Sequence, residues 1–268
     1  MATVVCCRWL DAFPASYVRI LRNAVRANLA RPHRFICVTD DPAALPDVET
    51  RLLPDMGIPE RHQRSGGWPK ISLFKPGLLP PDEPTLFLDL DILVKGSLDP
   101  FLDRVIRFRG VHGLREWNPV PWWIVPASLR PDRGIQSSVL GFYPGEQAVI
   151  YDRFMADRDA AYAMVENEQQ FITVCSPHRR YFPLDWTASF KWHCVSYYPL
   201  NLLRPEPREP RAASVVVFHG NPRPIQLVPL GDYRWGTRRK FGHGPVDWVR
   251  DYWLRHDESW AEPPARAA

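Results

Sequence analysis

The sequence contains no long hydrophobic run. A helix that spans a membrane needs roughly 18 consecutive apolar residues, and no segment of this 268-residue chain approaches that length. The first eight residues lack a basic stretch ahead of an apolar core, so they predict a buried first strand and not a signal peptide. We therefore expect a folded, cytoplasmic protein.

Cysteines are few and follow no disulfide or metal-binding pattern. Their number is odd, and no two have the CxxC spacing of a zinc knuckle. Reduced, buried thiols in the cytoplasm are the simplest expectation. The five residues are Cys6, Cys7, Cys37, Cys175 and Cys194.

The sequence also lacks internal repeats, a long linker and any recognised nucleic-acid-binding motif. Hydrophobic residues make up 45% of the chain and charged residues 24%, which is close to the globular average and excludes a disordered or fibrous protein. The length lies within reach of one α/β domain. We expect that domain over residues 1–230, followed by a basic and aromatic C-terminal extension over residues 231–268.

The charge is small overall but unevenly distributed. The formal net charge is +4, yet residues 204–240 alone contain eight basic and three acidic residues. A local positive field of this kind favours a phosphate-bearing ligand or an anionic membrane surface over duplex nucleic acid. We therefore expect no nucleic-acid partner.

The predicted elements are short and alternate between strand and helix. With 29 residues, proline is about twice as frequent as its usual share of ~5%. This favours turns and loops, because proline fixes φ and lacks an amide donor. The alternation predicts an α/β domain with a mixed, mainly parallel central sheet flanked by helices. Apolar periodicity predicts strands over residues 3–7, 35–39, 50–53, 85–90, 105–112, 139–143 and 214–219, helices over 15–31, 69–74 and 146–157, and an irregular chain between 157 and 214.

The most informative segment is the apolar strand over residues 85–90. Alternate side chains of a strand share a face, so Asp89 and Asp91 project to one side at its carboxyl end. Ligands of open α/β sheets bind beyond the carboxyl ends of the strands. Two carboxylates there repel unless one is protonated or a cation bridges them, and Mn²⁺ or Mg²⁺ chelated by phosphate oxygens would do so. The alternative is a strand-end cap or an ion pair.

Several motifs follow one another between residues 3 and 225. They are Gly67-Trp-Pro-Lys70, Phe87-Leu-Asp-Leu-Asp91 followed by Val94-Lys-Gly-Ser-Leu-Asp99, Gln136-Ser-Ser-Val-Leu140, Glu168-Gln169, and Phe218-His-Gly-Asn-Pro-Arg-Pro224. In this order they resemble the motifs of the nucleotide-sugar-dependent glycosyltransferases of the GT-A fold. The resemblance is to the family eight group, which contains glycogenin and bacterial lipopolysaccharide glycosyltransferases.

The resemblance implies a role for each matched residue. Asp89, Asp91 and His219 would hold Mn²⁺ (or Mg²⁺) on the diphosphate of a nucleotide sugar, which the resemblance makes UDP-linked. Gln169 would lie near the anomeric carbon as the catalytic residue, in a transfer that retains the anomeric configuration. The acceptor would be a saccharide, a lipid-linked molecule or a protein. The implied donor-binding residues are Lys70, Gln136, Ser137, Gly220 and Arg223.

The sequence departs from the family pattern at several positions. His219 directly precedes Gly220, whereas better-known members place two residues between them. Arg223 stands where lysine is usual, which keeps the charge but replaces a point donor with a planar fork. Gln136 replaces asparagine and Glu168 replaces aspartate, and each is one methylene longer. These differences leave the reach of His219 to the metal open.

Two aromatic segments lie outside these motifs. The first, residues 116–133, contains three tryptophans that would stack on sugar rings if exposed and pack in the core if buried. The second, residues 234–260, combines basic residues with aromatics at helical spacing, which suits either peripheral contact with the inner face of a membrane or packing onto the domain. The residues concerned are Trp117, Trp122 and Trp123 in the first segment, and Arg234, Arg238, Arg239, Lys240, Trp248, Tyr252, Trp253 and Trp260 in the second.

Two other functions are compatible with the aspartate pair. A phosphatase of the haloacid dehalogenase type also carries Asp-x-Asp after an apolar strand. Its motif is expected near the N-terminus and before glycine and threonine, whereas Ile92 and Leu93 follow the pair here. The non-enzymatic alternative is a sugar- or nucleotide-binding protein that has lost turnover, for which only the altered His219 loop argues.

Overall fold

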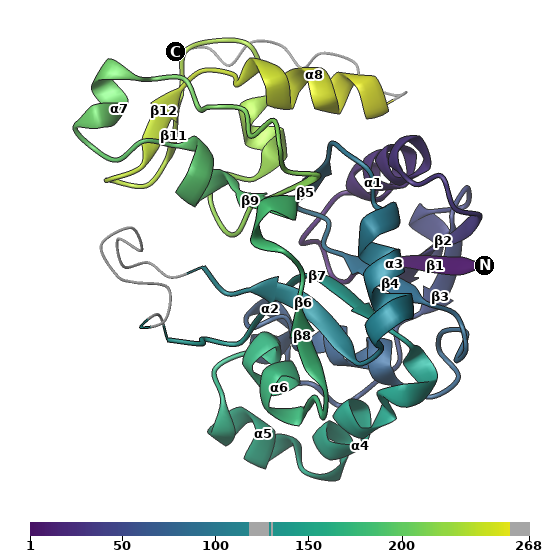
Figure 1. Ribbon diagram of the computed structural model, residues 1–268. Helices are drawn as coiled ribbons and strands as arrows, with labels where there is room; N and C mark the ends of the chain where they lie inside the picture. Colours follow the sequence, from purple (N-terminus) through teal and green to yellow (C-terminus); the bar gives the residue numbers. More distant parts are fainter. Residues whose placement is uncertain (118–128, 130, 258–268) are drawn as a thin grey trace. The chain divides into compact units, whose positions relative to one another are not determined.

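The computed structural model describes residues 1–117, 129 and 131–257 (Figure 1). The chain forms two compact units. The first unit contains residues 1–14, 31–89 and 99–183, and the second contains residues 15–30, 90–98 and those from 184 onward. Each unit is therefore assembled from three separate stretches of chain. The domain boundary expected after residue 230 stays a prediction.

The first unit is built on a sheet whose strands follow the order β3-β2-β1-β4-β7-β6-β8. Neighbouring strands are parallel except β7, which is antiparallel to both β4 and β6. The apolar run of β1 is buried on both faces, as expected for a central parallel strand. The predicted mixed, mainly parallel sheet is confirmed. Its strands are β1 (Ala2–Arg8), β2 (His33–Thr39), β3 (Glu49–Leu52), β4 (Thr85–Leu88), β6 (Val111–Arg115), β7 (Ile135–Phe142) and β8 (Arg179–Tyr181).

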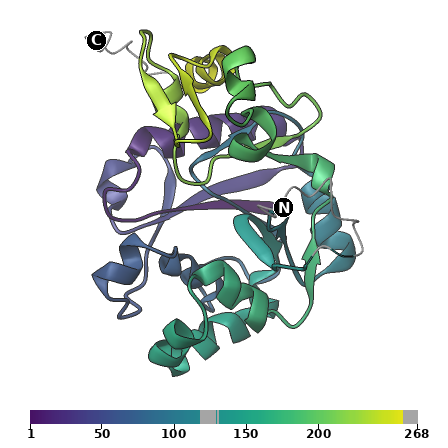
Figure 2. The ribbon, with the colours of Figure 1, turned by 90° about the vertical axis from the view of Figure 1, so that its left-hand side faces the viewer.

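Helices cover this sheet, and Figures 1 and 2 show α4, α5 and α6 gathered on one side of it. The buried ring of Trp68, in the 3₁₀ segment η2, contacts Phe154, Tyr162 and Phe171 with ring centroids 4.9 to 5.8 Å apart. These contacts fix η2 beside α4, α5 and α6. The helical segments of this unit are η1 (Pro42–Ala44), α2 (Glu60–Arg64), η2 (Trp68–Phe74), α3 (Asp99–Phe108), η4 (Pro144–Glu146), α4 (Ala148–Ala156), α5 (Arg158–Met164) and α6 (Glu168–Cys175).

Two expectations about secondary structure are wrong. The segment predicted as a strand over residues 105–112 is mostly α3, and β6 begins only at Val111. The chain after residue 157 is helical in α5 and α6 and not irregular. In α3 the burial follows helical spacing, which the two-residue alternation of a strand could not produce. The fully buried side chains concerned are Phe101, Leu102 and Val105.

The second unit contains two small sheets and three α-helices among the residues that the structure describes. In the first sheet β10 lies between β5, which is antiparallel to it, and β9, which is parallel to it. The second sheet pairs β11 with β12. The elements are α1 (Ala15–Asn28), β5 (Ile92–Val94), η5 (Leu184–Trp186), β9 (Thr187–Ser189), the π-helical turn η6 (Phe190–Cys194), α7 (Leu200–Leu203), β10 (Val215–Val217), η7 (Pro224–Leu227), β11 (Arg234–Gly236), β12 (Phe241–His243) and α8 (Asp247–His256).

Helix α8 confirms the predicted helical spacing and buries its aromatic side. Trp253 is 1% exposed and meets the Tyr17 ring of α1 edge-on, with centroids 4.8 Å apart. The Tyr252 hydroxyl accepts a hydrogen bond from the Val94 amide at 3.1 Å. These aromatics are core residues of the second unit, so they offer no membrane-binding face. Trp260, Trp122 and Trp123 lie outside the described residues.

The cysteine side chains lie in the protein interior. All five cysteines are buried, and none forms a disulfide. The predicted burial of the thiols is therefore confirmed. None of the helices in the described ranges is long and apolar enough to span a membrane.

His112 is a buried histidine of β6. Its Nε2 lies 2.9 Å from the Arg109 carbonyl oxygen, and its ring packs against Phe182. Burial lowers the pKa of His112 to about 4, the nearby charges of Arg104 and Arg180 add to this, and the Arg109 contact opposes it. His112 is therefore neutral in the folded protein near neutral pH.

Acid is expected to destabilise the first unit through His112. Its unfolded pKa is near 6.5 and its folded pKa near 4, so the unfolded chain binds more protons between these values and the free energy of unfolding falls as pH drops through that window. At about pH 5 the loss is about 2 kcal/mol relative to about pH 7.5. Urea unfolding at both pH values should show this loss in wild type, a smaller one in His112→Phe, and an unchanged one in the exposed-site control His243→Gln. An equal pH dependence in His112→Phe would contradict this account.

Candidate active site

The first predicted aspartate lies directly after β4, where a lysine neutralises it. The Nζ of Lys70 donates to Asp89 Oδ2 at 2.7 Å and lies 3.4 Å from Glu168 Oε1. Lys70 and Glu168 are only 7% and 4% exposed. The Asp89 amide donates to the Ser138 carbonyl at 2.9 Å, which extends the β4–β7 pairing to this residue. Burial makes this ion pair stronger than a surface pair.

Local sequence explains how Lys70 and Glu168 come together. Gly67 has a left-handed φ of 64° and precedes Pro69 at the start of η2. A Cβ on Gly67 would lie 2.6 Å from the Glu168 carboxyl carbon, so only glycine lets the chain pass so close. The Glu168 amide also donates to the Gly66 carbonyl at 2.9 Å. The glycine pair before Lys70 therefore makes room for this carboxylate.

The side chains of β7 divide between its two faces. Ser137 donates from Oγ to Glu168 Oε1 at 2.6 Å and so joins Lys70 and Asp89. Gln136 points to the other face, where its Nε2 donates to Ser138 Oγ at 2.7 Å. We call Lys70, Asp89, Ser137 and Glu168 the polar cluster. It unites three predicted site residues with Glu168, to which the sequence assigned no role, whereas Gln136 lies apart.

Gln169 follows Glu168 in the first turn of α6. Its Nε2 donates to Glu116 Oε2 at 2.7 Å, and Glu116 stands just after β6. Burial raises the pKa of Glu116, and the Gln169 hydrogen bond partly offsets the rise. Glu116 was missed because it lies 53 residues from Gln169 in the chain and belongs to no motif. It fixes the orientation of the Gln169 amide.

The second predicted aspartate belongs to the second unit. Asp91 precedes β5, and its carbonyl accepts a hydrogen bond at 2.9 Å from the amide of Phe218, which follows β10. His219 is the next residue, so Asp91 and His219 lie at the same end of the β5–β10 pair. The His219 Nε2 is 2.6 Å from Ser189 Oγ. A metal bound through this nitrogen would have to replace that contact.

The electrostatic surroundings keep His219 uncharged. Burial, with the nearby charges of Lys191 and Lys240, lowers the pKa of His219 to about 4. Burial also lowers the pKa of Lys191, and the pKa of Lys240 to about 8. A neutral imidazole is the form that binds metal ions.

The remaining predicted residues follow His219 in the same loop. Gly220 has a positive φ of 80°. The amide of Arg223 donates to Gln226 Oε1 at 2.7 Å as η7 begins. The second unit therefore brings Asp91, His219, Gly220 and Arg223 to one strand end and the loop that continues it.

A hard divalent cation fits the chemistry of the predicted donor set. Asp89 and Asp91 offer carboxylate oxygens, and His219 offers a neutral nitrogen. Within the described residues, however, no three His, Cys, Asp or Glu side chains gather closely enough to hold a metal ion. Asp89 belongs to the first unit, whereas Asp91 and His219 belong to the second. The metal role of these residues stays a prediction.

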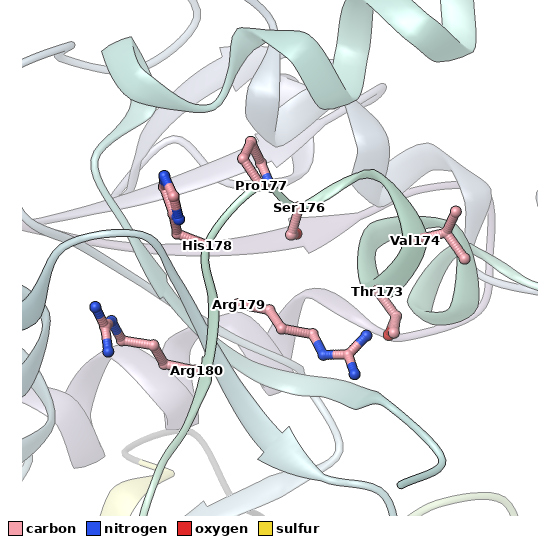
Figure 3. Close-up of a pocket in the computed structure, with 7 residues that line it drawn as sticks. All are labelled: Thr173, Val174, Ser176, Pro177, His178, Arg179 and Arg180. Carbon is pink, nitrogen blue, oxygen red and sulfur yellow. The ribbon is translucent and has the colours of Figure 1, made fainter.

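A hollow of about 510 Å³ lies elsewhere in the first unit, after α6 (Figure 3). Figure 3 shows Arg179 and Arg180 on opposite sides of the chain there. Arg179 pairs with Asp132 at 2.7 Å, and Arg180 donates to the Phe108 carbonyl at 3.1 Å. No predicted site residue lines this hollow. The lining residues are Thr173, Val174, Ser176, Pro177, His178, Arg179 and Arg180.

The sequence and the structure give different results when they are compared with known proteins. No family model and no curated protein matches the sequence. The structure, however, superposes on galactosyltransferase LgtC, solved in complex with donor and acceptor sugar analogs. The TM-score is 0.58 at 13% identity, over 98% of this chain and 97% of LgtC. The chain has a GT-A fold.

Two further solved structures with similar folds belong to longer chains. The glycosyltransferase GlyE of Streptococcus pneumoniae TIGR4 matches with a TM-score of 0.57 and 12% identity, over 97% of this chain but 60% of GlyE. The bifunctional glycosyltransferase WbbM matches with a TM-score of 0.53 and 12% identity, over 96% of this chain and 50% of WbbM. At these identities the GT-A fold is established, and the chemistry must be argued from the residues.

Proposed function

We propose that this chain is a metal-dependent glycosyltransferase that moves a sugar from a UDP-linked donor to an acceptor with retention of configuration. The observation that carries the proposal is the polar cluster at the carboxyl end of β4 in a GT-A fold. Lys70 neutralises Asp89 there, and Glu168, which accepts a hydrogen bond from Ser137, holds Lys70 in place. LgtC, whose structure contains donor and acceptor sugar analogs, shares this fold over nearly its whole length.

The residues have distinct parts in the transfer. Asp89, Asp91 and His219 would hold Mn²⁺ or Mg²⁺, which supplies charge stabilisation for the leaving diphosphate. Gly220 and Arg223 bind phosphate oxygens, and Lys70 contacts the donor. The bond from the anomeric carbon to the diphosphate oxygen breaks, and the oxygen of an acceptor hydroxyl forms the new bond on the same face. The hydroxyl proton passes to the leaving diphosphate oxygen. Positive groups placed where charge develops lower the barrier.

Gln169 acts at the sugar in this proposal. Its Nε2 is held by Glu116, so its carbonyl oxygen has a fixed direction. A Gln-to-Glu substitution in LgtC is described as an active-site mutant, which supports a glutamine at the reacting centre. Glu116 is then a positioning residue.

Gln169→Ala is expected to lower kcat by about a hundredfold and to leave UDP affinity unchanged, because Gln169 would contact the sugar and not the nucleotide. Steady-state kinetics and UDP calorimetry measure the two effects. Gln170→Ala on the same helix is the control and should retain both. Wild-type kcat in Gln169→Ala would remove this residue from the reaction.

We place the proposed membrane contact on helix α7 of the second unit and not on the buried aromatics of α8. Helix α7 buries its polar Asn201 against the Phe241 carbonyl and exposes its leucines, with Leu203 82% exposed. The Tyr198 amide donates to the Arg239 carbonyl at 2.9 Å, which places a basic turn beside them. Exposed apolar side chains next to arginines suit an anionic lipid surface. The α7 patch comprises Tyr197, Tyr198, Leu200, Leu202 and Leu203, with exposed Arg204, Arg238 and Arg239 nearby.

The α7 patch is expected to bind anionic vesicles. Pelleting with vesicles of phosphatidylglycerol should capture the wild-type protein at low salt, and capture should decline as salt rises. Leu202→Glu/Leu203→Glu should reduce capture by about tenfold or more, because both leucines would enter the interface. The exposed Leu184 lies outside the patch, so Leu184→Glu is the matched control. Equal capture of both variants would place the contact elsewhere.

One assay separates this function from its two alternatives. With Mn²⁺ and a nucleotide-sugar donor, a glycosyltransferase releases nucleoside diphosphate as sugar is transferred or hydrolysed. A phosphatase of the haloacid dehalogenase type releases inorganic phosphate from simple phosphomonoesters. A non-catalytic binding protein does neither. Metal-dependent thermal shift with a panel of nucleotide sugars would identify the donor.

A further inference from the structure

Two lysines outside every motif lie beside the His219–Gly220 loop. Lys191, in η6, donates from Nζ to the His219 carbonyl oxygen at 2.9 Å. Lys240, between β11 and β12, donates from Nζ to the Lys191 carbonyl oxygen. In the second unit Lys191 thus contacts the loop directly, and Lys240 contacts Lys191.

Within the described part of the chain, acidic side chains do not neutralise these lysines. Within the ranges that the structure describes, neither Lys191 nor Lys240 pairs with a carboxylate, whereas Lys70 and Lys95 do. Lys240 is 6% exposed and lies over the rings of Trp192 and Tyr197, 4.3 and 3.8 Å from their centroids. Rings and carbonyls hold a buried charge without cancelling it. An anionic ligand would therefore be stabilised here.

Gly220 leaves space for such a ligand next to Lys191. Among the described residues, and apart from its chain neighbours, the only atom within 4 Å of a Cβ built on Gly220 would be Lys191 Nζ, at 3.6 Å. The position is otherwise open. Because glycine has no side chain, a ligand oxygen can approach the backbone at this point within reach of the ammonium group.

We propose that Lys191 and the open face of Gly220 bind phosphate oxygens of the donor diphosphate, with Lys240 holding Lys191 in position. The inference rests on the proposed function for the identity of the ligand, although the site itself requires only an oxyanion. Lys191 is then a second cation, in addition to Arg223, that contacts the leaving diphosphate. Charge that develops on the diphosphate as the sugar departs would then be stabilised from the η6 side of the loop.

The test compares three ligands by calorimetry in the presence of Mn²⁺: UDP, inorganic pyrophosphate and uridine. Lys191→Met and Lys191→Gln should weaken UDP and pyrophosphate by about ten- to a hundredfold and leave uridine unchanged, because one charged hydrogen bond to phosphate is lost. Lys191→Arg should recover most of the affinity. The salt dependence of UDP binding should decrease in the neutral variants. Lys75→Met makes the same charge change in the first unit and should alter none of these values.

Each outcome separates the anion site from the proposed function. Wild-type UDP affinity in both folded neutral variants, or an equal loss for UDP and uridine, would overturn the role of Lys191 while leaving the function intact. Pyrophosphate binding that depends on Lys191, without any binding of UDP, would uphold the anion site and remove the nucleotide-sugar function. If wild type binds neither UDP nor pyrophosphate, both proposals fail. Thermal unfolding of each variant verifies that it is folded.

Discussion

Asp91→Ala is expected to abolish the Mn²⁺-dependent part of UDP binding and to lower turnover by at least about a hundredfold, since a direct metal ligand is removed. The fold should survive the change. The hydrogen bond that joins Asp91 to Phe218 uses the backbone carbonyl of Asp91, which alanine keeps. Calorimetry with UDP, with and without Mn²⁺, measures the effect directly.

A matched substitution shows whether that loss is specific. Asp82 is exposed and belongs to no predicted site, so Asp82→Ala should bind UDP and Mn²⁺ as wild type does. Asp89→Ala should resemble Asp91→Ala in its loss of metal-dependent binding. If Asp91→Ala keeps wild-type affinity and metal dependence, the metal role of the aspartate pair is refuted.

Lys70→Met is expected to reduce the free energy of unfolding by about 3 kcal/mol or more. The substitution leaves the buried carboxylate of Glu168 and the partly buried carboxylate of Asp89 without the cation that contacts both. Restoring electrostatic balance should therefore restore stability. The double variant Lys70→Met/Glu168→Gln is expected to recover part of the loss, because glutamine can still accept the hydrogen bond from Ser137.

Urea unfolding near neutral pH measures these stabilities. Lys75 is the half-buried residue that follows η2, and Lys75→Met is the control, which should change the free energy of unfolding by less than about 0.5 kcal/mol. A stability of Lys70→Met within that margin of wild type would show that the ion pair contributes no net stability. A loss that Glu168→Gln cannot reduce would assign the effect to packing of the lysine stem.

The fold was predictable where apolar periodicity was strong. The unbroken run of β4 and the helical stripe of α1 identify their elements because burial on two faces, or on one stripe, leaves a distinct pattern. The segment of α3 was misassigned because its apolar residues are dense enough to match both periods. Its tertiary contacts, which bury one helical face, decide between them.

The site was predictable only as far as local motifs extend. The chain places Asp89 at a strand end and Lys70 before a short helix, and both positions were visible in the sequence. Their contact with Glu168, and that of Gln169 with Glu116, join residues from separate elements whose pairing depends on how α6 packs. The glycine pair before Lys70 was the one local signal of the first contact. Lys191 gave none, whereas Lys240 was visible only as one member of the basic stretch over residues 204–240.

A chain cut after residue 230 would lose more than an appendage. Loss of Trp253 would leave Tyr17 without its aromatic neighbour, and loss of Tyr252 would leave the Val94 amide without its hydrogen-bond acceptor. Since residues 15–30 and 90–98 belong to the same unit as α8, no single cut releases either unit whole. Chimeras with other proteins of the GT-A fold that use one splice point would therefore divide two cores, and exchanges of several matched segments would be needed to keep them intact.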